Sequence, residues 1–172
     1  MRMDHGSSVT AADIINWSSE DELCRIFLEF GEEPRAKYLA HQICRQRKLK
    51  GYFTSTTQLS NLIYSCSHIV NATRNSIFKH PATRVFQALR IAVNDELNQI
   101  KEGVELAYDL LSPGGVLAII TFHALEDRIV KKFFETKVKL QGSLSLPANL
   151  PCKDDITVNI RCRSARLRVL LK

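Results

Sequence analysis

The sequence lacks the residue patterns that mark the commonest metal, cofactor and membrane sites. Its five cysteines form no C-x-x-C pair, and no histidines stand at zinc-finger spacing, so we predict no metal site. No glycine-rich segment follows a strand-like run and opens a helix, which is where a nucleotide-binding loop would lie. No apolar run approaches the roughly 20 residues that span a bilayer, so we predict no membrane partner.

The start of the chain has no recognisable targeting signal. The segment MRMDHGSSVTAAD has no hydrophobic core for secretion, and it contains acidic residues that mitochondrial transit peptides avoid. An odd, scattered set of cysteines is typical of buried or idle thiols in a reducing compartment. With 45% hydrophobic and 24% charged residues, the composition predicts a folded chain rather than a disordered one.

Positive charge is concentrated in two segments, within a formal net charge of +6. Residues 34–50 contain six basic residues and no acid: Arg35, Lys37, Arg45, Arg47, Lys48 and Lys50. The C-terminal segment contains Arg161, Arg163, Arg166, Arg168 and Lys172. Clustered lysine and arginine attract phosphate backbones. The alternative is a solvated helix face and a charge-protected edge strand.

Residues 10–79 are predicted to form a small helical unit. Its start and stop signals are, in order, Ser19 with Glu22, Gly31, Pro34, Gly51, and Ser55 with Gln58. The apolar stripe predicted for the middle helix is Ala36, Leu39, Ala40, Ile43 and Cys44. Three short helices with a basic face could be a nucleic-acid-binding module or a plain helical insertion.

Residues 83–134 have the helix, strand, helix order of an α/β fold. Helical periodicity covers 83–111 with a break near Asn94, and Gly114 with Gly115 forms a turn rather than a cofactor loop. The apolar run 116–122 predicts a parallel strand that is covered on both faces. We predict that a helix begins near Ala124.

The last part of the chain is predicted to be a loop followed by two strands. The loop covers 141–155, and the strands 156–160 and 165–171 would form an antiparallel edge pair. Asn94, Asp95 and Glu96 could reach a ligand, but they also form a serviceable helix cap.

Candidate chemistry lies where the predicted strand 116–122 ends, because sites in open α/β sheets lie beyond the carboxyl ends of the strands. The side chains at that edge are His123, Glu126, Asp127 and Arg128. Alternatively, the two acids only favour the positive helix start and His123 satisfies a local hydrogen bond. The pattern leaves both interpretations open.

Several motifs together resemble one enzyme family. They are HPATRVFQALRIAVNDEL (80–97), LLSPGGVLAIITFHALEDRIVKKFF (110–134), RCRSARLRV (161–169), and at the start MRMD (1–4), SVTAADIIN (8–16) and FGEEPRAKYLA (30–40). They resemble the ribosomal small-subunit RNA cytosine-N4 methyltransferases, which use S-adenosylmethionine. Thr121 and Ala124 depart from the serines of the family pattern, and Ile160 and Cys162 depart near the end.

The resemblance implies an α/β chain that holds the C-terminal half of a class I (Rossmann-like) methyltransferase sheet with a helical insertion. Residues 1–9 would be a remnant of the N-terminal half, 10–79 the insertion, and 80–172 the C-terminal part. Candidate catalytic residues, none with an assigned role, are Asp4, His123, Glu126, Asp127 and Arg128. Candidate RNA-binding residues are Arg35, Lys37, Arg45, Arg47 and Lys48.

The family's cofactor-binding segment cannot be placed on this sequence. In the family, M-R-M-D follows the first strands, the glycine-rich loop, the acid for the cofactor ribose and the motif that holds the target base. We therefore expect a truncated, inactive form that retains no cofactor-binding residues. The alternative is a non-catalytic RNA- or protein-binding module.

The resemblance also implies partners and a compartment. The partners would be small-subunit ribosomal RNA and a complementary fragment or full-length relative. The family acts in mitochondria in eukaryotes and in the cytoplasm in bacteria, so one of these is the expected location.

Overall fold

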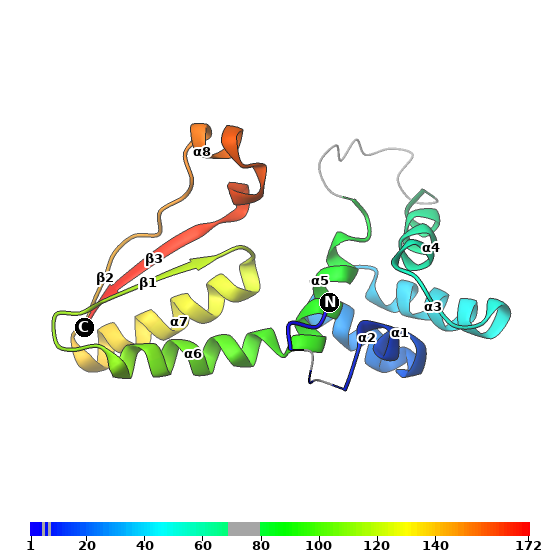
Figure 1. Cartoon of the computed structure of the whole chain (residues 1–172), viewed down its shortest axis with the longest axis horizontal. Coiled ribbons are helices and arrows are strands. Elements are labelled where there is room, and N and C mark those ends of the chain that lie inside the picture. Colours follow the sequence, from blue (N-terminus) through cyan, green and yellow to red (C-terminus); the bar gives the residue numbers. More distant parts are fainter. Residues whose placement is uncertain (5, 7, 69–79) are drawn as a thin grey trace. The chain divides into compact units, whose positions relative to one another are not determined.

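The structure, a computed structural model, describes residues 1–4, 6, 8–68 and 80–172, which form two compact units (Figure 1). The first unit is Met1–Glu96 and the second is Leu97–Lys172. The predicted boundary at residues 79 and 80 differs from this division, because the helix that follows it shares the core of the helical unit. The assignment of insertion and methyltransferase parts stays a prediction, and residues 69–79 lie outside the described residues. No described helix is long and apolar enough to cross a membrane.

The first unit is helical. Its helices are α1 (Ala11–Trp17), α2 (Glu20–Glu29), α3 (Ala36–Lys50), α4 (Thr56–His68) and α5 (Thr83–Asn94). The predicted capping box of Ser19 with Glu22 is confirmed at the start of α2. Helix α1 was not predicted, although Thr10 and Asp13 form the same kind of reciprocal cap at its start.

The predicted middle helix is confirmed as α3, with a start two residues later than Pro34. It ends at Gly51, whose φ of 85° lies in the left-handed region that favours glycine. Four residues of the predicted stripe are buried and Cys44 packs against the same core. These four are Ala36, Leu39, Ala40 and Ile43.

Gly31 stands where α2 and α5 approach closely. A Cβ atom there would lie 2.7 Å from the carbonyl oxygens of both Phe27 and Arg84. The glycine therefore does more than stop a helix, which was its predicted role. It permits the contact through which α5 joins the core of the first unit. That core includes Val85, Ala88 and Leu89 of α5 together with Leu23, Phe27, Leu59 and Ile63.

The second unit is an α/β structure with two long helices on one side of a small sheet (Figure 1). Its elements are α6 (Glu96–Leu110), β1 (Val116–Thr121), α7 (Ala124–Gln141), β2 (Leu144–Ser145), α8 (Lys153–Val158), a short 3-10 helix η1 (Ile160–Ser164) and β3 (Arg166–Leu171). The helix break predicted near Asn94 is confirmed, because Asp95 takes a left-handed conformation with φ 48°.

The sheet has the order β1-β3-β2, and β3 pairs antiparallel with both neighbours. The prediction of a parallel strand covered on both faces is therefore wrong for the described residues. The apolar run made β1 look doubly covered, but α6 and α7 cover one face alone. Leu117, Ile119 and Leu170 pack there with Val130 and Phe134 of α7.

The predicted strand over 156–160 is also wrong. Cys152 caps the backbone amide of Asp155, whose carboxylate reaches back to the Cys152 amide, and this reciprocal cap begins α8. The predicted strand over 165–171 is confirmed as β3. The partner expected for it is replaced by β1, and by β2 within the segment predicted as a loop.

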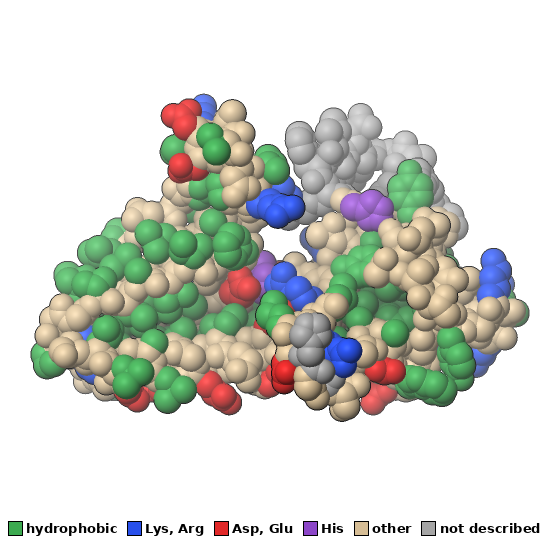
Figure 2. Space-filling model, in the orientation of Figure 1, with side chains coloured by type: hydrophobic (Ala, Val, Ile, Leu, Met, Phe, Trp, Pro, Cys, Tyr) green, Lys and Arg blue, Asp and Glu red, His purple; other side chains and the backbone are tan. Residues whose placement is uncertain are grey.

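The other face of the sheet is apolar and open within the second unit, and Figure 2 shows hydrophobic side chains gathered over it. Val116, Ala118 and Ile120 of β1 are exposed on this face, and Ile120 is 58% exposed. Their register partners are Leu171, Val169 and Leu167 of β3, and exposed Leu144 lies opposite Leu171. We call this the open sheet face.

Candidate functional site

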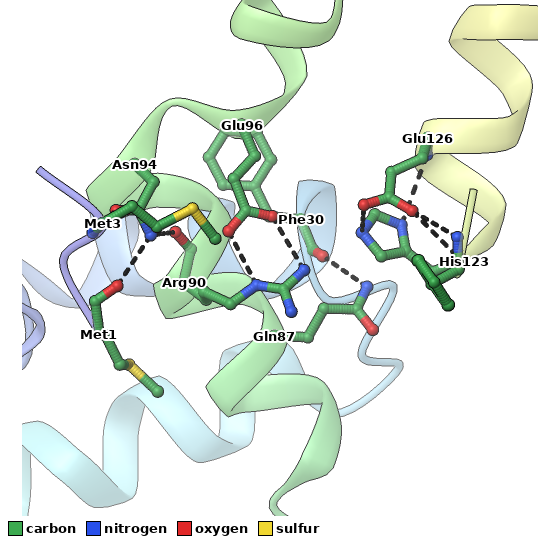
Figure 3. Close-up of polar contacts among 10 residues, drawn as sticks. Met1, Met3, Phe30, Gln87, Arg90, Asn94, Glu96, His123 and Glu126 are labelled. Carbon is green, nitrogen blue, oxygen red and sulfur yellow. Dashed lines mark hydrogen bonds and ion pairs between the residues drawn. The ribbon is translucent and has the colours of Figure 1, made fainter. Parts of the chain in front are cut away.

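The predicted site edge begins at the start of α7, directly after β1. The Glu126 carboxylate accepts hydrogen bonds from the backbone amides of Phe122 (2.7 Å) and His123 (3.2 Å) (Figure 3). His123 is the N-cap, and its Nδ1 accepts from the Glu126 amide at 3.4 Å. The pair thus forms a reciprocal cap that satisfies amides of the first helical turn.

The contacts of Glu126 also set its charge. Burial raises the pKa of this carboxyl, but hydrogen bonds from the His123 side chain and the Phe122 amide outweigh burial, and the net pKa is lowered. Glu126 is therefore held as the carboxylate. This suits a hydrogen-bond acceptor and does not suit a general acid at neutral pH.

Asp127 lies in an ion-pair cluster with two arginines of β3. Arg168 donates from Nε and one terminal nitrogen to its two carboxylate oxygens, at 2.6 and 3.0 Å. Arg166 donates to the same carboxylate at 3.1 Å. The Arg168 hydrogen bond lowers the pKa of Asp127 despite burial, and the same bond raises the pKa of Arg168. This cluster joins α7 to the last strand.

The remaining candidates are surface residues. Arg128 is exposed on α7 in the second unit, and Asp4 is exposed in the first unit, where it accepts a hydrogen bond from the Gly6 amide at 2.8 Å. Asn94 holds the neighbouring segment, because it donates to the Met1 carbonyl (2.9 Å) and accepts from the Met3 amide (2.7 Å) (Figure 3). Catalytic roles for Asp4 and for His123 to Arg128 stay predictions.

The glycine pair between α6 and β1 does not form a cofactor cradle. The Gly114 amide donates to the Lys172 carbonyl at 2.8 Å, and the Gly115 amide donates to the Ser112 carbonyl at 2.9 Å. Both amides are used inside the protein, so neither is left for a ligand. The interpretation of this pair as a turn is confirmed. The expectation that the chain retains no residues for S-adenosylmethionine stays a prediction.

The candidate RNA-binding residues of the first unit divide into two groups. Arg47 donates to the carbonyl oxygens of Ile15 and Ser18, both at 2.9 Å, and Arg35 contacts Glu33. Arg47 therefore joins α3 to the end of α1, and the guanidinium of Arg35 is engaged within the first unit. The others have exposed side chains: Lys37, Arg45 and Lys48, together with the basic residue Lys50.

The MraW methylase family model matches residues 1–172. The chain belongs to the MraW methylase family. It is similar to proteins named ribosomal RNA small subunit methyltransferase H: 41% identical to that of Chlorobium chlorochromatii over 100% of this chain and 56% of the relative. The relative from Dictyoglomus thermophilum is 43% identical over 98% of this chain and 54% of the relative. The relative from Thermomicrobium roseum is 44% identical over 98% of this chain and 55% of the relative.

This MraW-family chain therefore spans about half the length of the curated relatives it matches. The predicted family is confirmed. The predicted fold class is confirmed as α/β, whereas the class I arrangement of the sheet remains a proposal.

Trp17 and Tyr52 form an exposed aromatic contact in this MraW-family chain that was not predicted from the sequence. Their ring centroids are 4.9 Å apart, and both rings are largely exposed. The signal in the sequence was the chain's one tryptophan, outside any predicted apolar stripe. Its partner 35 positions later could not be read from local spacing.

Proposed function

We propose that these residues are part of an S-adenosylmethionine-dependent methyltransferase that acts on small-subunit ribosomal RNA. The observation that carries the proposal is the family match along residues 1–172, together with relatives that are named for this activity. In this proposal residues 10–79, which lie within the first unit, are the helical insertion, and residues 80–172 are the C-terminal part of the methyltransferase domain.

We propose further that the methyl group goes to the exocyclic amine of a cytidine, as the sequence resemblance implies. That amine is a poor nucleophile because its lone pair is delocalised into the ring. The reaction therefore needs close positioning and acceptors for the amine hydrogens. From the same resemblance we propose a mitochondrial location if the source is a eukaryote and a cytoplasmic location if it is a bacterium.

The cofactor, in this proposal, is bound by a polypeptide segment that corresponds to the part of the relatives outside the matched region. Two features of the second unit support an association with such a segment. The open sheet face exposes apolar side chains, and among the described residues no strand pairs with the outer edge of β1. Exposed strand edges and large apolar patches are typical of surfaces that bind another element.

A complementation experiment tests this proposal. The 172 residues and the remaining part of the Chlorobium chlorochromatii relative are prepared separately, and methyl transfer from labelled S-adenosylmethionine to small-subunit ribosomal RNA is measured. We expect transfer from the mixture and none from the 172 residues alone. Ile120→Lys on the open sheet face should abolish transfer by the mixture. Leu140→Lys, at a 77% exposed position on α7, is the matched control and should not.

A second function, RNA binding without catalysis, is favoured by the exposed lysines and arginine of α3. The double variant Arg45→Ala with Lys48→Ala removes two exposed charges without touching the contacts of Arg47. We expect weaker and less salt-dependent binding to small-subunit ribosomal RNA, because fewer phosphate contacts release fewer counterions. Unchanged affinity in the double variant would exclude this surface.

A further inference from the structure

Trp17 and Tyr52 form an exposed aromatic pair on the first unit. Trp17 is the last residue of α1, and Tyr52 follows the glycine that ends α3. Trp17 is 69% exposed and Tyr52 is 57% exposed, with their ring planes inclined at 45°. Single exposed aromatic residues are ordinary on protein surfaces. Two that contact each other across a long sequence separation form a defined apolar surface.

The backbone that carries the pair is fixed on both sides. The side-chain amide of Asn16 donates to the carbonyl of Phe53 at 2.9 Å and accepts from the amide of Phe53 at 2.8 Å. Phe53 is itself buried in the core. Arg47 donates to the carbonyls on either side of Trp17, those of Ile15 and Ser18. A surface held in this way loses little conformational entropy when it binds a ligand.

Positive charge lies next to the pair in the chain. The last turn of α3 contains Arg47, Lys48 and Lys50, and Tyr52 lies two residues after Lys50, the last residue of that helix. Lys48 and Lys50 are exposed. Aromatic rings stack on nucleobases, and lysine side chains attract the phosphates that join them. This is the combination used by proteins that bind single-stranded nucleic acid.

We propose that Trp17 and Tyr52 are a stacking platform for one unstacked base of single-stranded RNA, with Lys48 and Lys50 contacting the adjoining phosphates. The inference rests on the proposed function only in taking RNA as the partner. It adds a base-binding subsite on the helical unit at Trp17 and Tyr52, which lie outside the predicted RNA-binding set and outside the predicted site edge. It also gives Lys48 of the predicted set a phosphate contact.

Tryptophan fluorescence tests the platform, because Trp17 is the chain's single tryptophan. The 172-residue protein is titrated with an eight-nucleotide single-stranded RNA and with the same oligonucleotide made abasic. We expect quenching by the RNA and little quenching by the abasic form, because it keeps the phosphates and lacks the stacking bases.

Substitutions then locate the site. Affinity is measured by anisotropy of labelled RNA, which does not depend on Trp17. We expect Tyr52→Ala and Trp17→Ala each to weaken binding roughly tenfold. Tyr38→Ala is the matched control, since Tyr38 is an exposed tyrosine near the start of α3, and it should leave the affinity unchanged.

Three results would overturn the platform. They are equal quenching by the abasic oligonucleotide, unchanged affinity in both aromatic variants, and an emission change on dilution without RNA that tracks a change in sedimentation. The last would identify the pair as a contact between copies of the chain. If complementation restores methyl transfer while the aromatic variants bind RNA normally, the proposed function stands and the platform is wrong.

Discussion

At the scale of single residues, Asp127 receives the densest set of charged contacts in the predicted site edge. It lies on α7, and both arginines that bind it lie on β3, so its carboxylate joins two elements that are far apart in sequence. Its position after a strand makes it a candidate catalytic residue in the sequence. The arginine partners show a structural use that local spacing could not reveal, because they lie about 40 residues away.

Asp127→Asn should lower the free energy of unfolding by about 2 kcal/mol, because it leaves Arg168 without its bidentate carboxylate partner. The pKa of Asp127 is depressed in the folded state, so its contribution is complete above the unfolded carboxyl pKa of about 4. That contribution is lost as the pH falls through the lower folded pKa. Urea unfolding between pH 7 and pH 2 checks both points, and an equal acid dependence in wild type and variant would contradict them.

Arg47 and Lys48 are adjacent basic residues with different expected roles. Arg47→Ala should destabilise the first unit by about 1–2 kcal/mol, because two carbonyls at the end of α1 lose their donor. Lys48→Ala should change stability by less than about 0.5 kcal/mol, since its side chain is exposed. Thermal unfolding of the two variants measures the difference. Equal stability losses would show that the Arg47 contacts do not hold the fold.

At the scale of elements, the helices were predictable where their signals are local. The reciprocal cap of Ser19 with Glu22, the stop at Gly51 and the start near Ala124 each depend on neighbours within four residues. The strand pairing was not predictable, because the partner of β1 lies about 50 residues along the chain. The strand predicted over 156–160 was wrong because the apolar residues of this segment resembled a strand. The cap that starts the helix lies before the segment, at Cys152.

Two glycines should respond in opposite directions to alanine. Gly31→Ala should destabilise by about 2 kcal/mol or more, because its Cβ would meet two backbone carbonyl oxygens at 2.7 Å. Gly103 is an exposed position within α6, where an added Cβ would meet nothing within 4 Å beyond its own helix backbone. Gly103→Ala should therefore stabilise by up to about 1 kcal/mol. Denaturant midpoints compare the two variants, and a neutral Gly31→Ala would refute the close packing of α2 and α5.

At the scale of the whole molecule, the sheet of the second unit has apolar side chains on both faces, and described residues of that unit cover one of them. The second unit buries Leu170 and leaves Val116, Ile120 and Leu144 exposed on the opposite face of the same sheet. Leaving such side chains in water forgoes about 25 cal/mol for each Å² of apolar surface that a covering element would bury. The family comparison supplies the context for this surface, since the matched relatives have nearly half of their length outside the match.

The open sheet face should make the 172-residue chain self-associate. Sedimentation velocity across a range of concentrations should show association that Ile120→Lys reduces and Leu140→Lys leaves unchanged. A monomer at all concentrations, with the same behaviour in both variants, would contradict the role given to this face.

We propose that these 172 residues form part of a methyltransferase whose cofactor site lies in a segment outside the matched region. Isothermal titration of the 172-residue chain with S-adenosylmethionine tests it most directly. We expect no binding heat at micromolar cofactor concentrations, because the amides of the glycine pair Gly114 and Gly115 are bonded within the protein. Saturable micromolar binding would contradict it.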